Sequence, residues 1–381
     1  MTRYQNHDDN SSSSSSSQKR FKTFDRGGVA FLSDLHHDVL FLVMMRLGFI
    51  DFFSFSGVCK SWRSFALANM NRFMASKPPM SIRIDHYPDN KKTLHLKDFE
   101  GRKFKTSIPH SAWRRCVGCT CGYLVLMGRD THDFWLVNPI TRHELYFTDH
   151  PLYVGVVDHL VTIRPILVFL PSISRRVFVM LHRKESSYRR SERTRKGKIS
   201  FSIEGKQGWN HVSSTLPIIG LQYFKGKIYT LHIDFSVREL RIYPNRKYKW
   251  TLLETNNFPD PDLFFQTNNF PKPDLFWPEL VSSGENLYVI DRFAPNEVLE
   301  LDVGEMKWVS PEKTIGEYAV FLNSCGSSVA IKPESWVGPR TQYKSYDKFL
   351  VTDRSRVHDI DLNSMWYFPH DCFSVNLLDD Q

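Results

Sequence analysis

Large apolar side chains recur at intervals of three and four residues between positions 35 and 62, which is the spacing of one face of an α-helix. They are Leu35, Val39, Leu40, Val43, Leu47, Phe52, Phe53, Phe55, Val58 and Trp62. The positions fall into three short runs, so the pattern predicts three small helices within residues 29–75. A module of about 40 residues lies at the limit for a free-standing hydrophobic core. We therefore expect a partner to cover part of this apolar surface.

The pattern changes to that of β-strands after Lys77-Pro78-Pro79, because proline removes a backbone donor and disfavours a helix before it. From residue 80 onward, short runs of aromatic and β-branched residues are separated by Gly, Asn, Asp and Pro. The runs lie at 122–127, 133–138, 226–231, 284–290, 298–303, 348–352 and 357–362. No amphipathic helix longer than about three turns is evident among them. The sequence thus predicts a large all-β domain over residues 80–381, after the helical module.

A weak internal repeat runs through this β region, in which two strands lead to a tryptophan that we expect in a polar turn. Gly226 precedes Trp250, and Gly284 precedes Trp308, at the same spacing of 24 residues. The interval from Trp209 to Trp250 is 41 residues, and the interval from Trp250 to Trp308 is 58. A repeat of about 40 to 50 residues with four short strands is typical of a β-propeller blade. We expect a β-propeller-like domain, in which each blade buries both faces against its neighbours.

The longer interval contains a duplication. The sequence T-N-N-F-P-D-P-D-L-F at 255–264 recurs almost unchanged as T-N-N-F-P-K-P-D-L-F at 267–276. Without one copy of this segment, the longer interval between tryptophans would fall to about 46, which fits one blade. Proline and asparagine favour turns, so the duplicated segment is predicted to be a loop. It is either a neutral duplication or a recognition loop.

The formal net charge of +9 is concentrated in two segments. Residues 183–198 hold eight Lys or Arg and two Glu, and residues 1–28 hold five Lys or Arg and three Asp. Together these segments carry eight of the nine excess charges, which argues against a basic binding face across the whole fold. We expect residues 183–198 to form a loop between a strand at 176–181 and a strand at 198–203 of one blade.

Residues 1–28 include seven consecutive serines and few apolar side chains, so we expect a disordered tail. The small basic cluster of Lys19, Arg20 and Lys22 is either part of a solvated tail or a nuclear import signal. The first residues lack the pattern of a secretory signal, and no apolar run is long enough to span a bilayer. Six cysteines in 381 residues do not form a disulfide framework. We expect a soluble protein of the cytoplasm or the nucleus.

A possible metal site is the C-x-x-C-x-C sequence of Cys116, Cys119 and Cys121, with His110 and His132 nearby. Zinc needs four converging ligands, and no second C-x-x-C occurs. Strand alternation would place Cys119 and Cys121 on one face and Cys116 on the other. We therefore expect buried cysteines and no metal. No nucleotide-binding or hydrolase motif is found, so the sequence predicts no cofactor and no enzyme activity.

The helical module resembles the F-box of plant F-box proteins, in which D-L-P-x-D is followed by V-C-x-S-W-R-S. The matching residues are Asp34, Leu35, Asp38, Val39, Leu40, Val43, Arg46, Leu47, Asp51, Phe55, Val58, Cys59, Ser61, Trp62, Arg63 and Ser64. His36 stands where the family has proline, so the fixed backbone angle of proline at the start of the helix is lost.

Residues 80–375 resemble the propeller-like domain that follows the F-box in kelch-related F-box proteins. The best single match is L-V-N-P-I-T-R at 136–142. Together the two resemblances imply a small three-helix F-box followed by a large β-propeller-like domain. They also imply a substrate-recognition adaptor of an SCF-type (Skp1–cullin–F-box) E3 ubiquitin ligase. Its F-box would bind a Skp1-like subunit and, through that subunit, a cullin, and its propeller would bind an unidentified protein substrate.

The residues expected to bind the Skp1-like subunit are Leu35, Asp38, Val39, Leu40, Val43, Leu47, Val58, Cys59 and Trp62. Some of them must instead hold the three helices together, and the sequence alone does not separate the two groups.

Two other functions remain open from the sequence. One is nucleic-acid binding by the basic residues 183–198, and the other is a propeller enzyme. Co-purification separates the three possibilities. An adaptor brings down a Skp1-like protein, an enzyme needs no partner, and a nucleic-acid binder shows a steep salt dependence on RNA or DNA.

Overall fold

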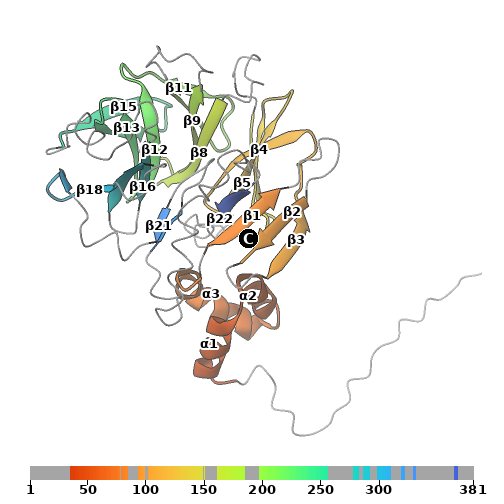
Figure 1. Cartoon of the computed structure of the whole chain (residues 1–381). Helices are drawn as coiled ribbons and strands as arrows, with labels where there is room; N and C mark the ends of the chain where they lie inside the picture. Colours follow the sequence, from red (N-terminus) through yellow and green to blue (C-terminus); the bar gives the residue numbers. More distant parts are fainter. Residues whose placement is uncertain are drawn as a thin grey trace, which may run out of the picture.

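The computed structural model describes residues 35–77, 79–84, 93–98, 102–148, 150, 161–184, 197–255, 278–282, 286–291, 298–309, 319–321, 329–331 and 364–367. Within these ranges, three helices are followed by 22 strands. Figure 1 shows the helices gathered at one end of the molecule and the sheets beyond them. This arrangement confirms the predicted fold class of a small helical module followed by a large β domain.

The three helices are α1 (His37–Arg46), α2 (Phe49–Ser56) and α3 (Lys60–Ala75). The connections between them are short, and Gly48 and Gly57 flank α2. Cys59 begins α3 as its N-cap, and its Sγ accepts a hydrogen bond from the backbone N–H of Trp62 at 3.4 Å. No helix in the described part of the chain is long and apolar enough to cross a membrane.

The first sheet, called blade 1 here, contains β1 (Met80–Ile84), β2 (Thr93–Lys97) and β3 (Lys103–Ser107). Its fourth strand is β22 (Ser364–Tyr367), which pairs antiparallel with β1. Figure 1 shows β22 between β1 and the second sheet. A strand from the far end of the sequence therefore completes the first blade, as in a propeller closed on itself.

The next three sheets each consist of four consecutive antiparallel strands. Blade 2 contains β4 (Arg114–Thr120), β5 (Tyr123–Gly128), β6 (Phe134–Val137) and β7 (Glu144–Phe147). Blade 3 contains β8 (Val161–Leu170), β9 (Arg175–Lys184), β10 (Lys198–Ile203) and β11 (Asn210–Val212). Blade 4 contains β12 (Ile218–Phe224), β13 (Lys227–His232), β14 (Val237–Ile242) and β15 (Tyr248–Leu253).

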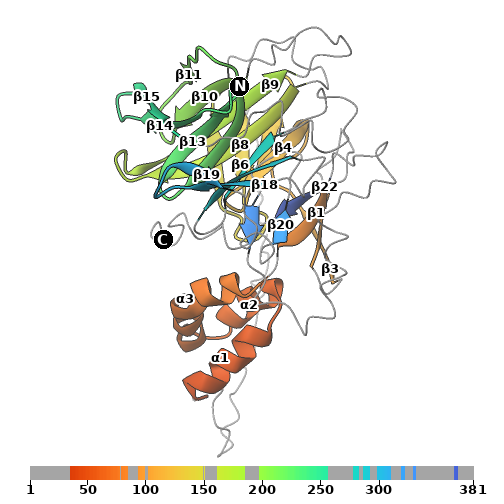
Figure 2. The same ribbon diagram turned by 60° about the vertical axis from the view of Figure 1, so that its left-hand side comes forward.

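Blade 5 contains β16 (Pro278–Ser282), β17 (Leu287–Asp291), β18 (Val298–Asp302) and β19 (Lys307–Val309). A hairpin of β20 (Ala319–Phe321) and β21 (Val329–Ile331) joins the same sheet, through a parallel pairing of Ser282 with Val329. Successive sheets contact one another through β22, β4, β8, β12 and β16. Figures 1 and 2 show the sheets following one another around a common centre.

Most strands of blades 2 to 5 are buried on both faces, because each sheet lies between two others. Phe134, Phe147 and Phe178 pack between blades 2 and 3. Leu231 and Leu280 belong to the apolar layer between blades 4 and 5. Because both faces of each propeller sheet are covered, its strands need apolar residues at successive positions.

Five of the predicted strands are confirmed: they correspond to β5, β6, β13, β17 and β18. The predicted strands at 348–352 and 357–362, the duplication at 255–276 apart from Thr255 and the tail 1–28 lie outside the described residues.

The expected position of the repeated tryptophans was wrong. Trp250 and Trp308 lie within β15 and β19, the last strands of their blades, and not in turns. Trp209 immediately precedes β11, the last strand of blade 3. Each of these tryptophans therefore lies in or next to the last strand of its blade, which explains why the interval between tryptophans matches the length of a blade.

Candidate partner-binding surface

The start of α1 keeps the backbone geometry of a proline without having one. His36 is the N-cap and has φ −58°, close to the angle that proline imposes. Its Nδ1 accepts a hydrogen bond from the backbone N–H of Asp38 at 3.4 Å and lies 3.2 Å from the Asp38 carboxylate. Asp38 also places a negative charge in the first helical turn, where it stabilises the helix.

One side of α1 packs into the helical core. Leu40 and Met44 are four residues apart and are fully buried there. Trp62 of α3 packs against Phe55, with 4.6 Å between ring centroids, and Phe52 stacks on Phe73 at 4.3 Å. These aromatic contacts hold α2 against α3 and give the small module a defined core.

The other side of α1 presents apolar side chains to solvent. Val39, Leu42 and Val43 are 44%, 64% and 41% exposed, and their spacing of three and four residues places them on one helical face. Within the described ranges, twelve large apolar side chains are exposed, and six of them lie in residues 35–67. These six, called the outward apolar set here, are Leu35, Val39, Leu42, Val43, Val58 and Leu67. Such a concentration in so small a module is typical of a protein-binding surface.

The structure separates the predicted contact residues into three groups. Leu35, Asp38, Val39, Val43 and Val58 are exposed, Leu47 and Cys59 are half-buried, and Leu40 and Trp62 are buried in the core. The sequence prediction missed Leu42 and Leu67, which are exposed. Leu42 could have been found from its spacing, since it is three residues from Val39. That these residues contact a Skp1-like subunit stays a prediction.

The helical module and blade 1 share one hydrophobic core. Side chains of all three helices and of β1, β2 and β22 belong to the same buried cluster. The Lys77 ammonium donates to the Met45 carbonyl at 2.9 Å and lies 4.7 Å from the centre of the Phe73 ring. Arg102, beside β3, pairs with Asp51 of α2 at 3.5 Å. These contacts fix the direction in which the outward apolar set points relative to the propeller.

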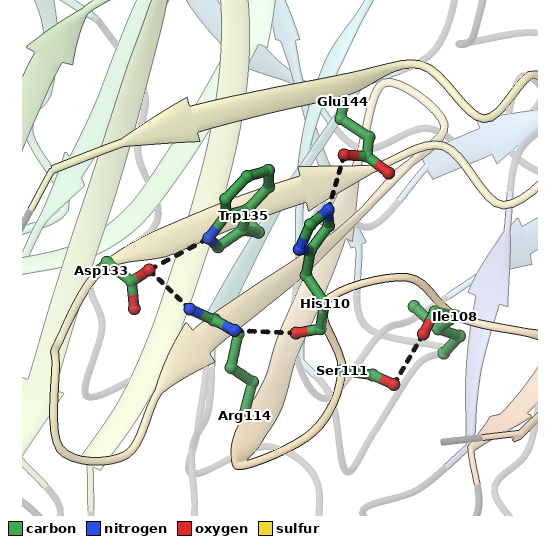
Figure 3. A network of polar contacts seen from close by, with 7 residues as sticks. All are labelled: Ile108, His110, Ser111, Arg114, Asp133, Trp135 and Glu144. Atoms are coloured by element: carbon green, nitrogen blue, oxygen red, sulfur yellow. Dashed lines mark hydrogen bonds and ion pairs between the residues drawn. The ribbon is translucent and has the colours of Figure 1, made fainter. Parts of the chain in front are cut away.

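A second group of side chains lies where blade 1 leads into blade 2 (Figure 3). The His110 ring stacks on the Trp135 indole, with 3.8 Å between centroids, and its Nε2 lies 2.9 Å from a Glu144 oxygen. The Arg114 guanidinium donates to the His110 carbonyl at 3.1 Å and to Asp133 at 2.8 Å. Trp135 Nε1 donates to the same Asp133 carboxylate at 3.0 Å. This network locks the connection between the two blades to the outer strands of blade 2.

Asp133 is the central acceptor of the network. Burial by itself would raise the pKa of the Asp133 carboxyl. Hydrogen bonds from Thr131, Arg114 and Trp135, together with the positive charge of Arg114, outweigh that effect and hold the pKa below its ordinary value. The carboxylate is therefore charged and fully engaged at neutral pH, which indicates a structural role and leaves no free acid for catalysis.

A histidine cluster lies at the contact of blades 2 and 3. The centroids of His150 and His182 are 4.9 Å apart, and His211 lies 5.6 Å from His150. Burial lowers the pKa of His150 to about 2, with further lowering from His182, His211 and His132. Burial lowers the pKa of His182 to about 4, with His211 and Lys198 adding to the effect. Both imidazoles are therefore neutral in the folded protein.

The cysteines of the C-x-x-C-x-C sequence contact backbone carbonyls. Cys119 Sγ donates to the Trp366 carbonyl at 3.1 Å, and Cys121 Sγ donates to the Leu167 carbonyl at 3.0 Å. Their predicted facing was wrong: a β-bulge at Val117 brings Cys116 and Cys119 to the same face, against Leu124 and Leu126. Cys121 follows the strand in a left-handed turn and packs in a different cluster. Among the described residues, no group of His, Cys, Asp and Glu is arranged to hold a metal ion.

The predicted strands beside the basic segment are confirmed. β9 and β10 pair antiparallel within blade 3, with Leu181 opposite Ile199, so residues 185–196 connect two neighbouring strands. Those twelve residues themselves lie outside the described ranges.

A shallow pocket between blades 3 and 4 has a volume of about 270 Å³. Glu239 in its wall pairs with Arg241 at 2.5 Å and with Lys227 at 3.4 Å. Both cations engage this one carboxylate, so the charged side chains of the lining leave a net charge of +1.

Comparison with known proteins assigns both parts of the chain. Residues 32–73 match the model of the F-box domain, and residues 93–345 match the model of the KIB1-4 beta-propeller. A search of the curated proteins finds no match.

Three solved structures show weak similarity to the chain. The nidogen/laminin complex has a TM-score of 0.25 and 9% identity, covering 67% of this chain and 99% of that one. The tricorn protease has a TM-score of 0.32 and 13% identity, with coverage of 64% and 22%. The Aleuria aurantia lectin, in complex with alpha-methyl-L-fucoside, has a TM-score of 0.28 and 10% identity, with coverage of 60% and 75%. At these scores the three structures carry no argument about this chain.

The propeller match, by contrast, spans more than half of the 381 residues, agrees with the four-stranded sheets and lies after the helical module in the sequence. The chain therefore belongs to the KIB1-4 beta-propeller family and carries an F-box domain in front of its propeller.

Proposed function

We propose that this F-box protein is a substrate-recognition adaptor of an SCF-type E3 ubiquitin ligase. Its helical module binds a Skp1-like subunit and thereby a cullin, while its propeller binds the protein to be ubiquitinated. The observation that carries the proposal is the outward apolar set, which the fold leaves exposed on an F-box domain. The adaptor itself breaks and forms no bonds. It raises the local concentration of substrate lysines near the ubiquitin-loaded enzyme.

The exposed and buried residues have different roles in this proposal. Val39, Leu42 and Val43 contact the Skp1-like subunit, while Leu40 and Trp62 hold the helices in the arrangement that presents them. Fully burying one large apolar side chain contributes roughly 1.5 to 3 kcal/mol. Because these side chains are already partly covered, each is expected to contribute about 1 kcal/mol to binding.

The shared core between the module and blade 1 supports the same function. A bound substrate must lie at a defined position relative to the ubiquitin-loaded enzyme, and a flexible joint would dilute the proximity effect. Lys77, in the α3–β1 connection, and Arg102, just before β3, both contact the helices and stiffen the joint. We further propose that the protein acts in the cytoplasm or the nucleus, where cysteine thiols such as Cys59 stay reduced.

Co-expression with a Skp1-like protein tests the proposal. The full chain should co-purify with that protein. When a cullin is added to the mixture, the cullin should co-purify as well. The double variant Val39→Ser with Val43→Ser should lose roughly 2 kcal/mol of binding, a drop of about thirtyfold in affinity, with little change in stability. The matched control is Leu252→Ser on β15, because Leu252 is 54% exposed and lies on blade 4, away from the module.

The control should co-purify like the wild type. Failure of the wild-type chain to retain a Skp1-like protein would contradict the proposal. Equal retention of the wild type and the double variant would show that α1 is not the contact surface. Steep salt-dependent binding to RNA or DNA in place of a protein partner would favour the nucleic-acid function.

A further inference from the structure

One face of blade 1 is left largely unpacked along β1, β2 and β3. Along β1, β2 and β3, buried or partly buried side chains alternate with more exposed ones. By contrast, β5 and β13 are buried along nearly their whole length on both faces. Figure 2 shows β3 at the outer side of the propeller, above the helices.

The unpacked face of blade 1 is basic. Arg83, Lys97, Lys103 and Lys105 lie on this face, and all four are exposed. The register forms two rows: Lys97 is directly opposite Lys103, and His95 lies between Arg83 and Lys105. The packed face of the same three strands carries apolar residues such as Ile82, in the core shared with the helices. The charge is therefore confined to one side of the sheet.

These four cations have no carboxylate partner in the described part of the chain. The nearest acidic residue in sequence, Asp98, pairs with Arg102 at 2.7 Å. Like charges directly opposite in an antiparallel pair destabilise a sheet, and Lys97 and Lys103 stand in that relation. Lysines on an outer strand protect its edge from pairing with another chain, which accounts for Lys103 and Lys105. Edge protection does not account for Arg83 and Lys97, which lie on strands paired on both sides.

We propose that this face of blade 1, called the basic face here, binds an acidic, extended segment of the target protein. The inference rests on the proposed function and names the chemistry of its substrate. Side chains on one side of an extended segment repeat at intervals of about 7 Å, because every second residue points the same way. The two rows of cations are separated by the same two-residue step. Two alternate carboxylates of one segment can therefore meet the two rows, one at Lys97 and Lys103 and the next in the row of Arg83 and Lys105.

A protein segment fits the basic face better than a nucleic acid does. Even a protein that makes roughly six to ten phosphate contacts loses much of its affinity for DNA as salt rises to physiological levels, and the basic face supplies four cations and a histidine. Single strands are held by aromatic side chains between the charges. On this face the aromatic residue is Trp366 of β22, which lies beside Ser81 at the end of one row and not between the cations.

Direct binding to a defined probe tests the proposal. The probe is a fluorescein-labelled peptide of alternating Glu and Ser, and its neutral counterpart has Gln in place of Glu. The full chain should bind the acidic peptide, with an affinity that falls as salt rises, and should ignore the neutral peptide. Lys97→Gln with Lys105→Gln should weaken binding about tenfold, and Lys97→Arg with Lys105→Arg should restore it.

The matched control removes the same charge elsewhere. Lys247→Gln with Lys249→Gln alters two exposed lysines in or next to β15 and should bind the acidic peptide like the wild type. Equal loss in both double variants would overturn the proposal, because only net charge would then matter. So would tighter binding of single-stranded DNA or of phosphatidylserine vesicles than of the acidic peptide.

Co-purification with a Skp1-like protein, measured on the same preparations, separates this inference from the proposed function. A wild-type chain that co-purifies but ignores the acidic peptide overturns the basic face and leaves the adaptor function intact. A chain that binds the peptide through Lys97 and Lys105 but never co-purifies supports an acidic-segment site and overturns its use in a ligase.

Discussion

Lowering the pH from about 7.5 to about 5 should destabilise the propeller through His150 and His182. The pKa of these groups is about 2 and about 4 in the folded protein, against 6.5 in an unfolded chain. Both values are lowered, so between these limits the unfolded chain binds protons that the folded chain does not. Stability is therefore fully present above pH 6.5 and falls as the pH falls toward 4.

The size of the effect follows from the difference in pKa. At pH 5, each histidine whose pKa is 6.5 when unfolded costs about 2 kcal/mol of stability, so the pair costs at most about 4 kcal/mol. Because the two rings are only 4.9 Å apart, the effects of replacing them are not expected to add fully. A loss of this size is a large fraction of the total stability of a folded domain, which is typically about 5 to about 15 kcal/mol.

Urea unfolding at the two pH values measures the effect. Replacing His150 with Phe and His182 with Leu removes the two titrating groups from an apolar environment that already contains Phe134 and Trp209. The double variant should lose about 3 to 4 kcal/mol less than the wild type on acidification. His37→Gln, an exposed histidine of α1, is the control and should behave like the wild type. Identical acid losses in the wild type and the double variant would refute the reasoning.

Three further substitutions test the packing. Trp62→Ala should cost about 3 to 5 kcal/mol of stability, because the indole fills the helical core against Phe55; thermal unfolding of the chain checks this. Tyr367→Phe should cost about 1 kcal/mol, because the Tyr367 hydroxyl, on β22 of blade 1, donates to the Gly122 carbonyl of blade 2 at 3.1 Å; urea unfolding checks this. Asp133→Ala should cost about 3 kcal/mol or more, because it leaves the Arg114 guanidinium without its carboxylate, and an unchanged denaturation midpoint would contradict the role given to this pair.

The sequence predicted the element types well because their periodicity is strong. Apolar runs bounded by turn residues mark β13 and β17, and a spacing of three and four marks α1. The sequence could not separate Val39 from Leu40, since both fit a helical pattern. Only the position of α3 decides which side of α1 is covered. α1 therefore has two apolar sides, and periodicity alone assigns both to the core.

Other features depend on contacts between distant parts of the chain. The facing of Cys116 could not be predicted, because a single bulge at Val117 reverses the alternation of β4 and leaves no mark in the composition. His150 and His182 come from different blades and belong to no motif, so their proximity appears only in three dimensions. The basic face of blade 1 was likewise hidden, because its cations are interleaved with apolar residues and are grouped only by the strand register.

Hydrogen–deuterium exchange of the full chain, alone and bound to a Skp1-like protein, tests the central claim most directly. Binding should slow exchange in residues 35–47 and 58–67, which carry the outward apolar set, and leave the strands of blades 2 to 5 unchanged. Protection that appears on the propeller while α1 exchanges as in the free chain would contradict the account, and so would the absence of any complex.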